Sequence, residues 1–181
     1  MIDLKKSIEQ KAELLKSNAE QLLRIELMWY SPIEVNCQQL SSIEEFKKTG
    51  VLELFTQFKE YPFIYYFIVK NDIHSVDIIN ALHKYRLRKE RTCPKIDKRR
   101  SLDSRYLYCG SVKKELHGRF IQHLGFGSPQ TFSLQLFHWA TKLGLVLDFH
   151  YALLDKENRN ITELVESSLA SQIMPLVGKI A

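Results

Sequence analysis

The chain has 181 residues, of which 45% are apolar, 26% charged and 11% aromatic. This length and composition are typical of one globular domain, or of one domain with a small appendage, and they argue against wholesale disorder. Three cysteines are too few for a disulfide framework, and Met1 to Glu20 carries charges every few residues, unlike a secretory signal. No apolar run approaches the roughly 18 residues that a membrane span needs. We therefore expect a soluble cytoplasmic protein without membrane contact.

The positive charge is concentrated in one short segment. The whole chain carries +5, yet the segment from Lys84 to Arg100 holds nine basic residues against Glu90 and Asp97, a net charge of +7. The other 17 basic and 19 acidic residues leave the rest of the chain at −2. A concentrated cationic segment attracts polyanions, nucleic acid first, whereas most charge runs form solvated, mobile loops. The charge alone favours neither interpretation.

The first 60 residues are expected to form a helical accessory region. Apolar residues at three- and four-residue spacing predict an amphipathic helix from Met1 to about Tyr30, which Pro32 should stop. Shorter helices are expected over residues 43–48 and 51–58. The long helix either packs on the domain or makes a homodimer contact. Its stripe is too short for the clean heptads of a coiled coil, which favours packing on the domain.

Residues 61–181 are expected to form the main domain, with a basic insert at about residues 71–104. Three strand patterns, at residues 62–69, 106–110 and 145–154, predict a small, mainly antiparallel sheet of three strands. Helices are expected to flank it, which makes the fold α/β (α+β). The expected helices cover residues 74–90, 113–124, about 129–143 after an N-cap at Ser128, and 160 to about 174 with a near capping box of Asn160 and Glu163.

The chemistry-bearing residues lie around one strand and two helices. Familiar motifs are missing: the sequence has no CxxC, HxxxH, GxSxG or Walker loop. Tyr106 and Tyr108 are expected on one strand face, Arg119 and His123 on one helix face, and Glu166 at the rim of the last helix's apolar stripe. These are the side chains that a metal-assisted phosphodiester hydrolase uses. Taken singly, each is more often structural.

Four short motifs resemble those of the GIY-YIG nuclease superfamily, over about residues 62–179. The first is Ile64-Tyr65-Tyr66, and the second is Tyr108-Cys109-Gly110. Arg119 and His123 are similar to the family's Arg in the next helix and the His one turn later. Glu166, followed by Leu169 and Pro175 at the family's intervals, is similar to its metal-binding Glu.

The resemblance implies a metal-dependent endonuclease that hydrolyses DNA phosphodiester bonds. Tyr66 and Tyr108 would position or activate the attacking water, and Arg119 would bind the scissile phosphate with His123 assisting. Glu166 would hold one Mg²⁺ or Mn²⁺.

Tyr65 and Tyr66 are both candidates for the first tyrosine. Neighbours on a strand point to opposite faces, so only one can serve. The third position of the motif selects Tyr66.

The implied partner is DNA, double-stranded in the first instance. Lysine and arginine would hold its phosphates without reading its sequence. The candidate residues lie in the insert and directly after the second motif: Arg86, Arg88, Lys89, Arg91, Lys95, Lys98, Arg99, Arg100, Lys113 and Lys114.

The chain also departs from the family pattern. Ile64 stands where Gly is usual, Tyr66 and Tyr108 are 42 positions apart, and Val177-Gly178-Lys179 stands where an Asn often follows the last Pro. These departures motivate a second hypothesis, a catalytically weak or inactive nucleic-acid-binding module with the same fold. A third is a structural or partner-binding protein. The retained metal ligand, Glu166, favours the nuclease.

Overall fold

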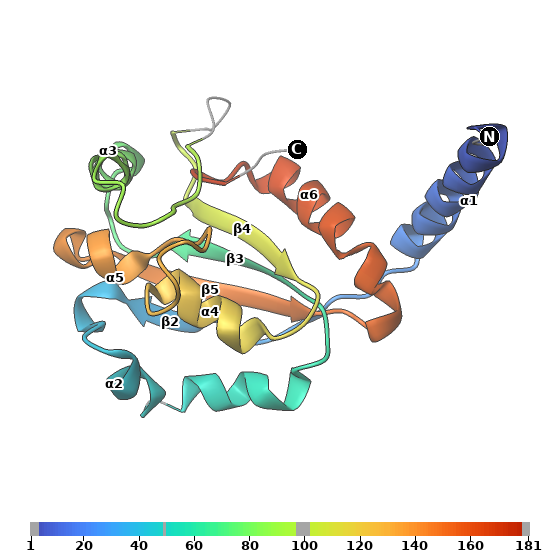
Figure 1. The fold of residues 1–181 in the computed structure, drawn as a ribbon. Helices are drawn as coiled ribbons and strands as arrows, with labels where there is room; N and C mark the ends of the chain where they lie inside the picture. The colour runs from blue at the N-terminus through green and yellow to red at the C-terminus, as the bar shows by residue number, and fades with distance from the viewer. Residues whose placement is uncertain (1–3, 49, 97–101, 179–181) are drawn as a thin grey trace.

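The computed structural model describes residues 4–48, 50–96 and 102–178, and its centre is one five-stranded sheet (Figure 1). Every pairing is antiparallel, in the order β1-β5-β3-β4, and β2 also pairs with β5. The mixed α+β class is confirmed, but the sheet has five strands instead of the expected three. The strands are β1 (Met28–Trp29), β2 (Ile33–Asn36), β3 (Phe63–Val69), β4 (Tyr106–Val112) and β5 (Val146–Leu153).

Six α-helices and four 3₁₀ segments surround the sheet in the part of the chain that the structure describes. Among these residues no helix is both long and apolar enough to span a membrane. The helices are α1 (Leu4–Leu23), α2 (Ile43–Lys47), α3 (Ser75–Leu87), α4 (Leu116–Leu124), α5 (Leu136–Trp139) and α6 (Thr162–Ile173), with η1 (Cys37–Gln39), η2 (Val51–Phe58), η3 (Thr141–Leu143) and η4 (Lys156–Asn160).

The N-terminal 60 residues are not a separate helical region. β2 pairs with β5 along its whole length, and residues from β2 to η2, among them Val35 and Phe55, are buried in the same core as the sheet. The predicted helix also ends earlier, at Leu23, and projects from the body (Figure 1). The expected boundary at residue 60 is therefore wrong, because strands of two and four residues are too short to give a sequence pattern.

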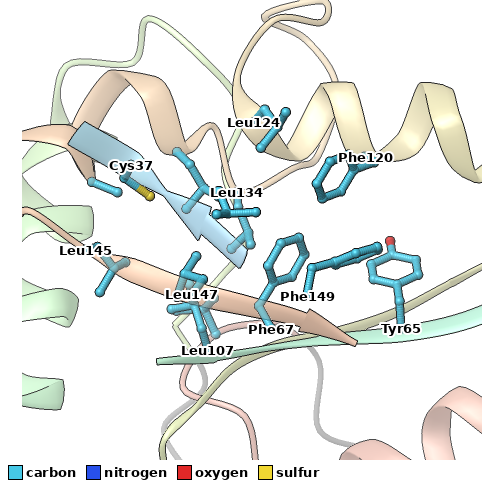
Figure 2. Close-up of a cluster of buried hydrophobic side chains, with 14 of the residues drawn as sticks. Cys37, Tyr65, Phe67, Leu107, Phe120, Leu124, Leu134, Leu145, Leu147 and Phe149 are labelled. Carbon is cyan, nitrogen blue, oxygen red and sulfur yellow. The ribbon is translucent and has the colours of Figure 1, made fainter. Parts of the chain in front are cut away.

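The core lies on one face of the sheet. Figure 2 shows Tyr65, Phe67 and Phe149 rising from the strands toward Phe120 of α4. The rings of Phe120 and Phe149 are 4.5 Å apart, and those of Phe67 and Phe149 are 4.7 Å apart. The opposite face carries a smaller cluster, in which α6 covers the sheet around Ile64.

The basic insert is folded onto this core as far as it is described. The inner face of α3, including Ile78, Leu82 and Tyr85, is buried together with Cys93. The interpretation of the charged segment from Lys84 onward as a loop is therefore wrong for residues 84–87, which belong to α3. Apolar residues at helical spacing anchor one face of α3 and leave its cations on the other.

The helix expected over residues 129–143 is wrong over its first half. Residues 127–135 form a loop, and only the four residues of α5 and the short η3 turn are helical. Backbone groups of this loop bind distant side chains: Leu134 N donates to His123 Nδ1, and Arg119 donates to the Phe132 carbonyl. These tertiary contacts override the local preference for a helix after Ser128 and Pro129. The capping box at residue 160 is also absent, since Ile161 is the N-cap of α6.

Candidate active site

Tyr65, and not Tyr66, faces the other candidate residues. Tyr65 is fully buried under α4, and its hydroxyl lies 3.0 Å from both Arg119 Nε and His123 Nε2. Tyr66 points to the opposite face of the sheet, where its ring stacks on His150 at 4.8 Å. The selection of Tyr66 is therefore corrected, because the strand's two faces place only Tyr65 toward α4.

A β-bulge separates the two tyrosines of β4. The register between β3 and β4 shifts at Phe67, so that Tyr108 lies opposite Phe67 whereas Tyr106 lies opposite Ile68. The Tyr108 ring stacks on Tyr65, and the Tyr106 ring packs on Tyr66. The expectation that Tyr106 and Tyr108 share a face is wrong, because a bulge changes which residues point to each side.

Arg119 is the centre of the cluster. Its guanidinium donates from Nε to Tyr65, from Nη2 to the Tyr108 hydroxyl at 3.3 Å, and from Nη1 to Gln122 Oε1 and the Phe132 carbonyl. These contacts engage four of the five N–H donors of an arginine and leave one on Nη2. All four partners are neutral, and no carboxylate of the described residues pairs with Arg119. A half-buried cation without an ion-pair partner among the described residues can bind an anion.

His123 is a positioning residue. Its ring is fully buried, and its Nδ1 accepts from the Leu134 backbone N–H, which leaves Nε2 to donate to the Tyr65 hydroxyl. Burial, and then the charge of Arg119, lower the pKa of His123 well below its ordinary value. His123 is therefore a neutral donor that orients Tyr65, and it does not reach a substrate.

Gly110 allows the two tyrosines to meet Arg119. A Cβ at this position would lie 2.6 Å from the Tyr65 hydroxyl oxygen and 2.7 Å from the Tyr108 ring. Real Cβ atoms do not make such contacts, so any side chain here would displace the hydroxyl groups from Arg119. The close packing of Tyr65 and Tyr108 thus explains why the second motif ends in a glycine.

Glu166 enters from α6 on the other side of β4. Its carboxylate accepts a hydrogen bond from the Ser111 hydroxyl of β4. Burial raises the pKa of Glu166, while the Ser111 hydrogen bond and the charge of Arg119 act in the opposite direction. Its neighbour one turn earlier, Glu163, instead forms an ion pair with Lys113 at 2.9 Å.

A cleft of about 410 Å³ joins these groups at the edge of the sheet. It is lined by Pro94, Lys95, Tyr108, Cys109, Phe132, Glu166 and Gly178. Burial raises the pKa of the Cys109 thiol to about 12, so a thiolate nucleophile is absent at neutral pH. A Cβ at Gly178 would lie 3.2 Å from the Tyr108 ring, and the Gly178 N–H donates to the Lys95 carbonyl at 2.9 Å.

Glu166 fits a site for one hard divalent ion. Among the described residues no group of three or more His, Cys, Asp or Glu could hold a metal by itself. Mg²⁺, however, commonly takes one or two carboxylates and completes its shell with water and substrate phosphate. A lone carboxylate, anchored by Ser111 in an open cleft, suits that mode of binding.

The structure spreads the candidate DNA-binding residues over more than one surface. Lys95 lines the cleft of Glu166, and Arg86, Lys89 and Arg91 line an adjacent cleft. Arg88 and Lys114 are exposed elsewhere. Lys98, Arg99 and Arg100 lie outside the described residues.

Sequence reasoning missed three neighbours of the site: Ser111, Gln122 and Phe132. Ser111 and Gln122 stand one and three positions from motif residues, so their spacing alone could have indicated them. Phe132 has no such signal, because the loop that carries it is placed by tertiary contacts.

Comparison of the chain with protein-family models, with curated proteins and with solved structures finds no match. The geometry of the cluster therefore carries the functional interpretation.

Proposed function

We propose that the chain is a metal-dependent endonuclease that hydrolyses DNA phosphodiester bonds through a site of the GIY-YIG type. The observation that carries this proposal is Arg119, a half-buried guanidinium held entirely by neutral groups beside a cleft that contains Glu166. An anion with several oxygen atoms, such as a phosphodiester, complements both the charge and the remaining Nη2 donor.

Each residue of the cluster has a separate task in the proposed reaction. Arg119 neutralises the charge that builds up on the phosphate oxygens, in a geometry fixed before the substrate binds. Tyr108, which lines the cleft, holds the attacking water through its hydroxyl. Tyr65 and His123 keep Arg119 and Tyr108 in place from behind.

Neither tyrosine acts as a phenolate. Burial raises the pKa of both Tyr65 and Tyr108 above the ordinary value of 10.0, so both hydroxyls stay protonated at neutral pH. They orient water and the guanidinium through hydrogen bonds. A divalent ion bound by Glu166 would polarise the phosphate and favour deprotonation of water.

The decisive experiment compares metal-dependent cleavage by variants of α6. Supercoiled, linear and single-stranded DNA are each incubated with the protein in Mg²⁺, in Mn²⁺ and in EDTA. Glu166→Gln should lower the rate at least about 100-fold, the size of loss seen when one catalytic electrostatic partner is removed. Glu163→Gln, on the same helix but outside the cleft, is the matched control and should cleave normally.

The alternative function has a distinct outcome in the same assay. Salt-sensitive retention of DNA without metal-dependent cleavage would identify a nucleic-acid-binding module with this fold. Neither cleavage nor retention would contradict both proposals and favour a partner-binding protein.

We also propose that α1 binds α1 of a second copy in antiparallel orientation. Ile8, Ala12, Leu15 and Ala19 form an exposed stripe along α1, which buries none of its residues. In an antiparallel pair Ile8 meets Ala19 of the other copy, and Ala12 meets Leu15. Each layer then combines one large and one small side chain, which lets the helices approach closely.

Charge complementarity supports a second copy as the partner of this stripe. In the same register Glu9 of one copy flanks Lys16 of the other, and the two-fold symmetry repeats the pair. A dimer of this kind would bring two sites to one DNA molecule.

A further inference from the structure

Two clefts on the surface meet at one side chain, Phe132. The first is the cleft of Tyr108 and Glu166, and the second is lined by cations of the insert, among them Arg86 and Lys89. Phe132 lines both, and 55% of its surface is exposed. A phenylalanine this exposed is uncommon. Among the described residues, Trp29 is the other phenylalanine or tryptophan with an exposed side chain.

The loop that carries Phe132 is anchored from both sides. The Phe132 carbonyl accepts from Arg119 Nη1 at 2.7 Å, which joins the loop directly to the proposed phosphate site. Arg91 of the insert donates to the Gly127 carbonyl at 3.0 Å, and Thr92 N donates to the Pro129 carbonyl at 2.7 Å. The backbone that carries the exposed ring is therefore held in place beside both clefts.

The position of the Phe132 ring would place it beside a nucleotide that adjoins the proposed cut. A phosphate bound by Arg119 would lie next to Phe132, because the Phe132 carbonyl accepts a hydrogen bond from the Arg119 guanidinium. The backbone on one side of this phosphate would then pass Phe132 and enter the second cleft, where Arg86, Lys89 and Arg91 outnumber Glu90. An exposed aromatic ring between a phosphate site and a cationic groove is the arrangement that binds unpaired nucleotides by base stacking.

We infer that Phe132 stacks on an unpaired base next to the scissile phosphate, so that the substrate is DNA with single-stranded character at the cut. This inference rests on the proposed function, because Arg119 places the phosphate. A base inside a duplex is covered on both faces by its neighbours, and it cannot offer a face to Phe132 without leaving the stack. The cations of the second cleft then hold the phosphates of the single strand without reading its sequence.

The test measures stacking directly in a variant that cannot cleave. Glu166→Gln protein is titrated into a single-stranded oligonucleotide that carries 2-aminopurine, and into a hairpin duplex of the same sequence. Fluorescence quenching reports stacking, and anisotropy reports affinity. We expect tight binding and quenching with the single strand. Adding Phe132→Ala should weaken binding about 5- to 150-fold and abolish the quenching.

Two further variants exclude a merely structural effect. Phe132→Trp should restore both affinity and quenching, because indole also stacks on bases. Trp29→Ala removes an exposed aromatic ring on the other face of the sheet and should change neither signal.

Retained affinity and quenching in the Phe132→Ala protein, or equal affinity for the duplex, would overturn the inference. The nuclease proposal would stand in that case if the unsubstituted chain cleaves. Quenching that depends on Phe132, without metal-dependent cleavage by the unsubstituted chain, would instead support the stacking site and overturn the nuclease.

Discussion

Gly110 shows how one residue without a side chain governs the geometry of three others. The distances of 2.6 and 2.7 Å to a hypothetical Cβ mean that Gly110→Ala must move the Tyr65 hydroxyl and the Tyr108 ring. Displacements of about 1 Å in a catalytic cluster can cost 100-fold in rate. We therefore expect Gly110→Ala to lose about 100-fold or more in kcat for DNA cleavage, measured from initial rates.

A second glycine provides the matched control. Gly118, in α4, has nothing within 4 Å of a hypothetical Cβ. Gly118→Ala should leave cleavage unchanged and raise the melting temperature, because Ala in a helix is favoured over Gly by about 1 kcal/mol. Wild-type activity of Gly110→Ala would show that the packing of the two tyrosines does not control the reaction.

Ser111 should set the pH range over which Glu166 can bind a metal. Burial raises the pKa of Glu166, so its ionised form is lost as the pH falls through a value above the ordinary 4.5. The Ser111 hydroxyl stabilises the ionised form. Ser111→Ala should therefore shift the acid limb of Mn²⁺ binding to higher pH, measured by electron paramagnetic resonance. Ser171→Ala, at an exposed position of α6, the helix that carries Glu166, should leave the pH dependence of Mn²⁺ binding unchanged.

The sequence predicts most of the cluster but not its first tyrosine. Tyr108, Arg119, His123 and Glu166 follow from motif spacing, and the structure brings them together. The motif position selected Tyr66 instead of Tyr65, and the strand pattern could not correct that choice, because β3 is apolar on both faces and its alternation carries no signal. The contacts of Phe132 depend on a loop whose path is fixed by residues far away in the chain.

At the scale of whole elements, α1 offers the sharpest test. If α1 pairs with a second copy, Glu9→Lys places like charges opposite each other at two symmetric positions and should weaken the dimer. The double variant Glu9→Lys with Lys16→Glu restores opposite charges and should recover it. Sedimentation velocity distinguishes the monomer from the dimer. It is measured at low salt, because surface ion pairs are screened at high salt.

One control makes this result specific to the proposed charge pairs. Glu13→Lys changes the same charge on the same helix, away from the proposed pairs, and should not alter the dimer. A monomer at all concentrations in the unsubstituted chain would contradict the pairing.

The elements that the sequence predicts correctly are those with a long, consistent pattern. β3, β5, α4 and α6 each have a run of apolar residues or a clear stripe, and each is present with ends within a few residues of expectation. β1 and β2 were missed because their partner, β5, is more than 100 residues away. Local pattern cannot reveal a pairing at that separation.

At the scale of the whole molecule, the N-terminal segment after α1 supports the site. The Tyr65 ring packs on Phe149 at 5.6 Å, and Phe149 in turn packs on Phe55 of η2 at 6.2 Å. β2 covers the outer edge of β5, which would otherwise be open to pairing with other chains. Residues 28–58 are thus part of the structure that holds Tyr65.

Two truncations separate this role from that of α1. The chain from residue 24 onward keeps every strand and the whole buried core, so it should fold and nick DNA, with the loss of the proposed dimer. The chain from residue 61 onward loses two strands and the buried side chains of Val35 and Phe55, each large apolar truncation of this kind costing several kcal/mol. It should show no cooperative unfolding transition by circular dichroism and no cleavage. Cooperative unfolding of the shorter chain would show that residues 61–181 hold the site without the N-terminal strands, and the contacts of Phe55 would then be dispensable.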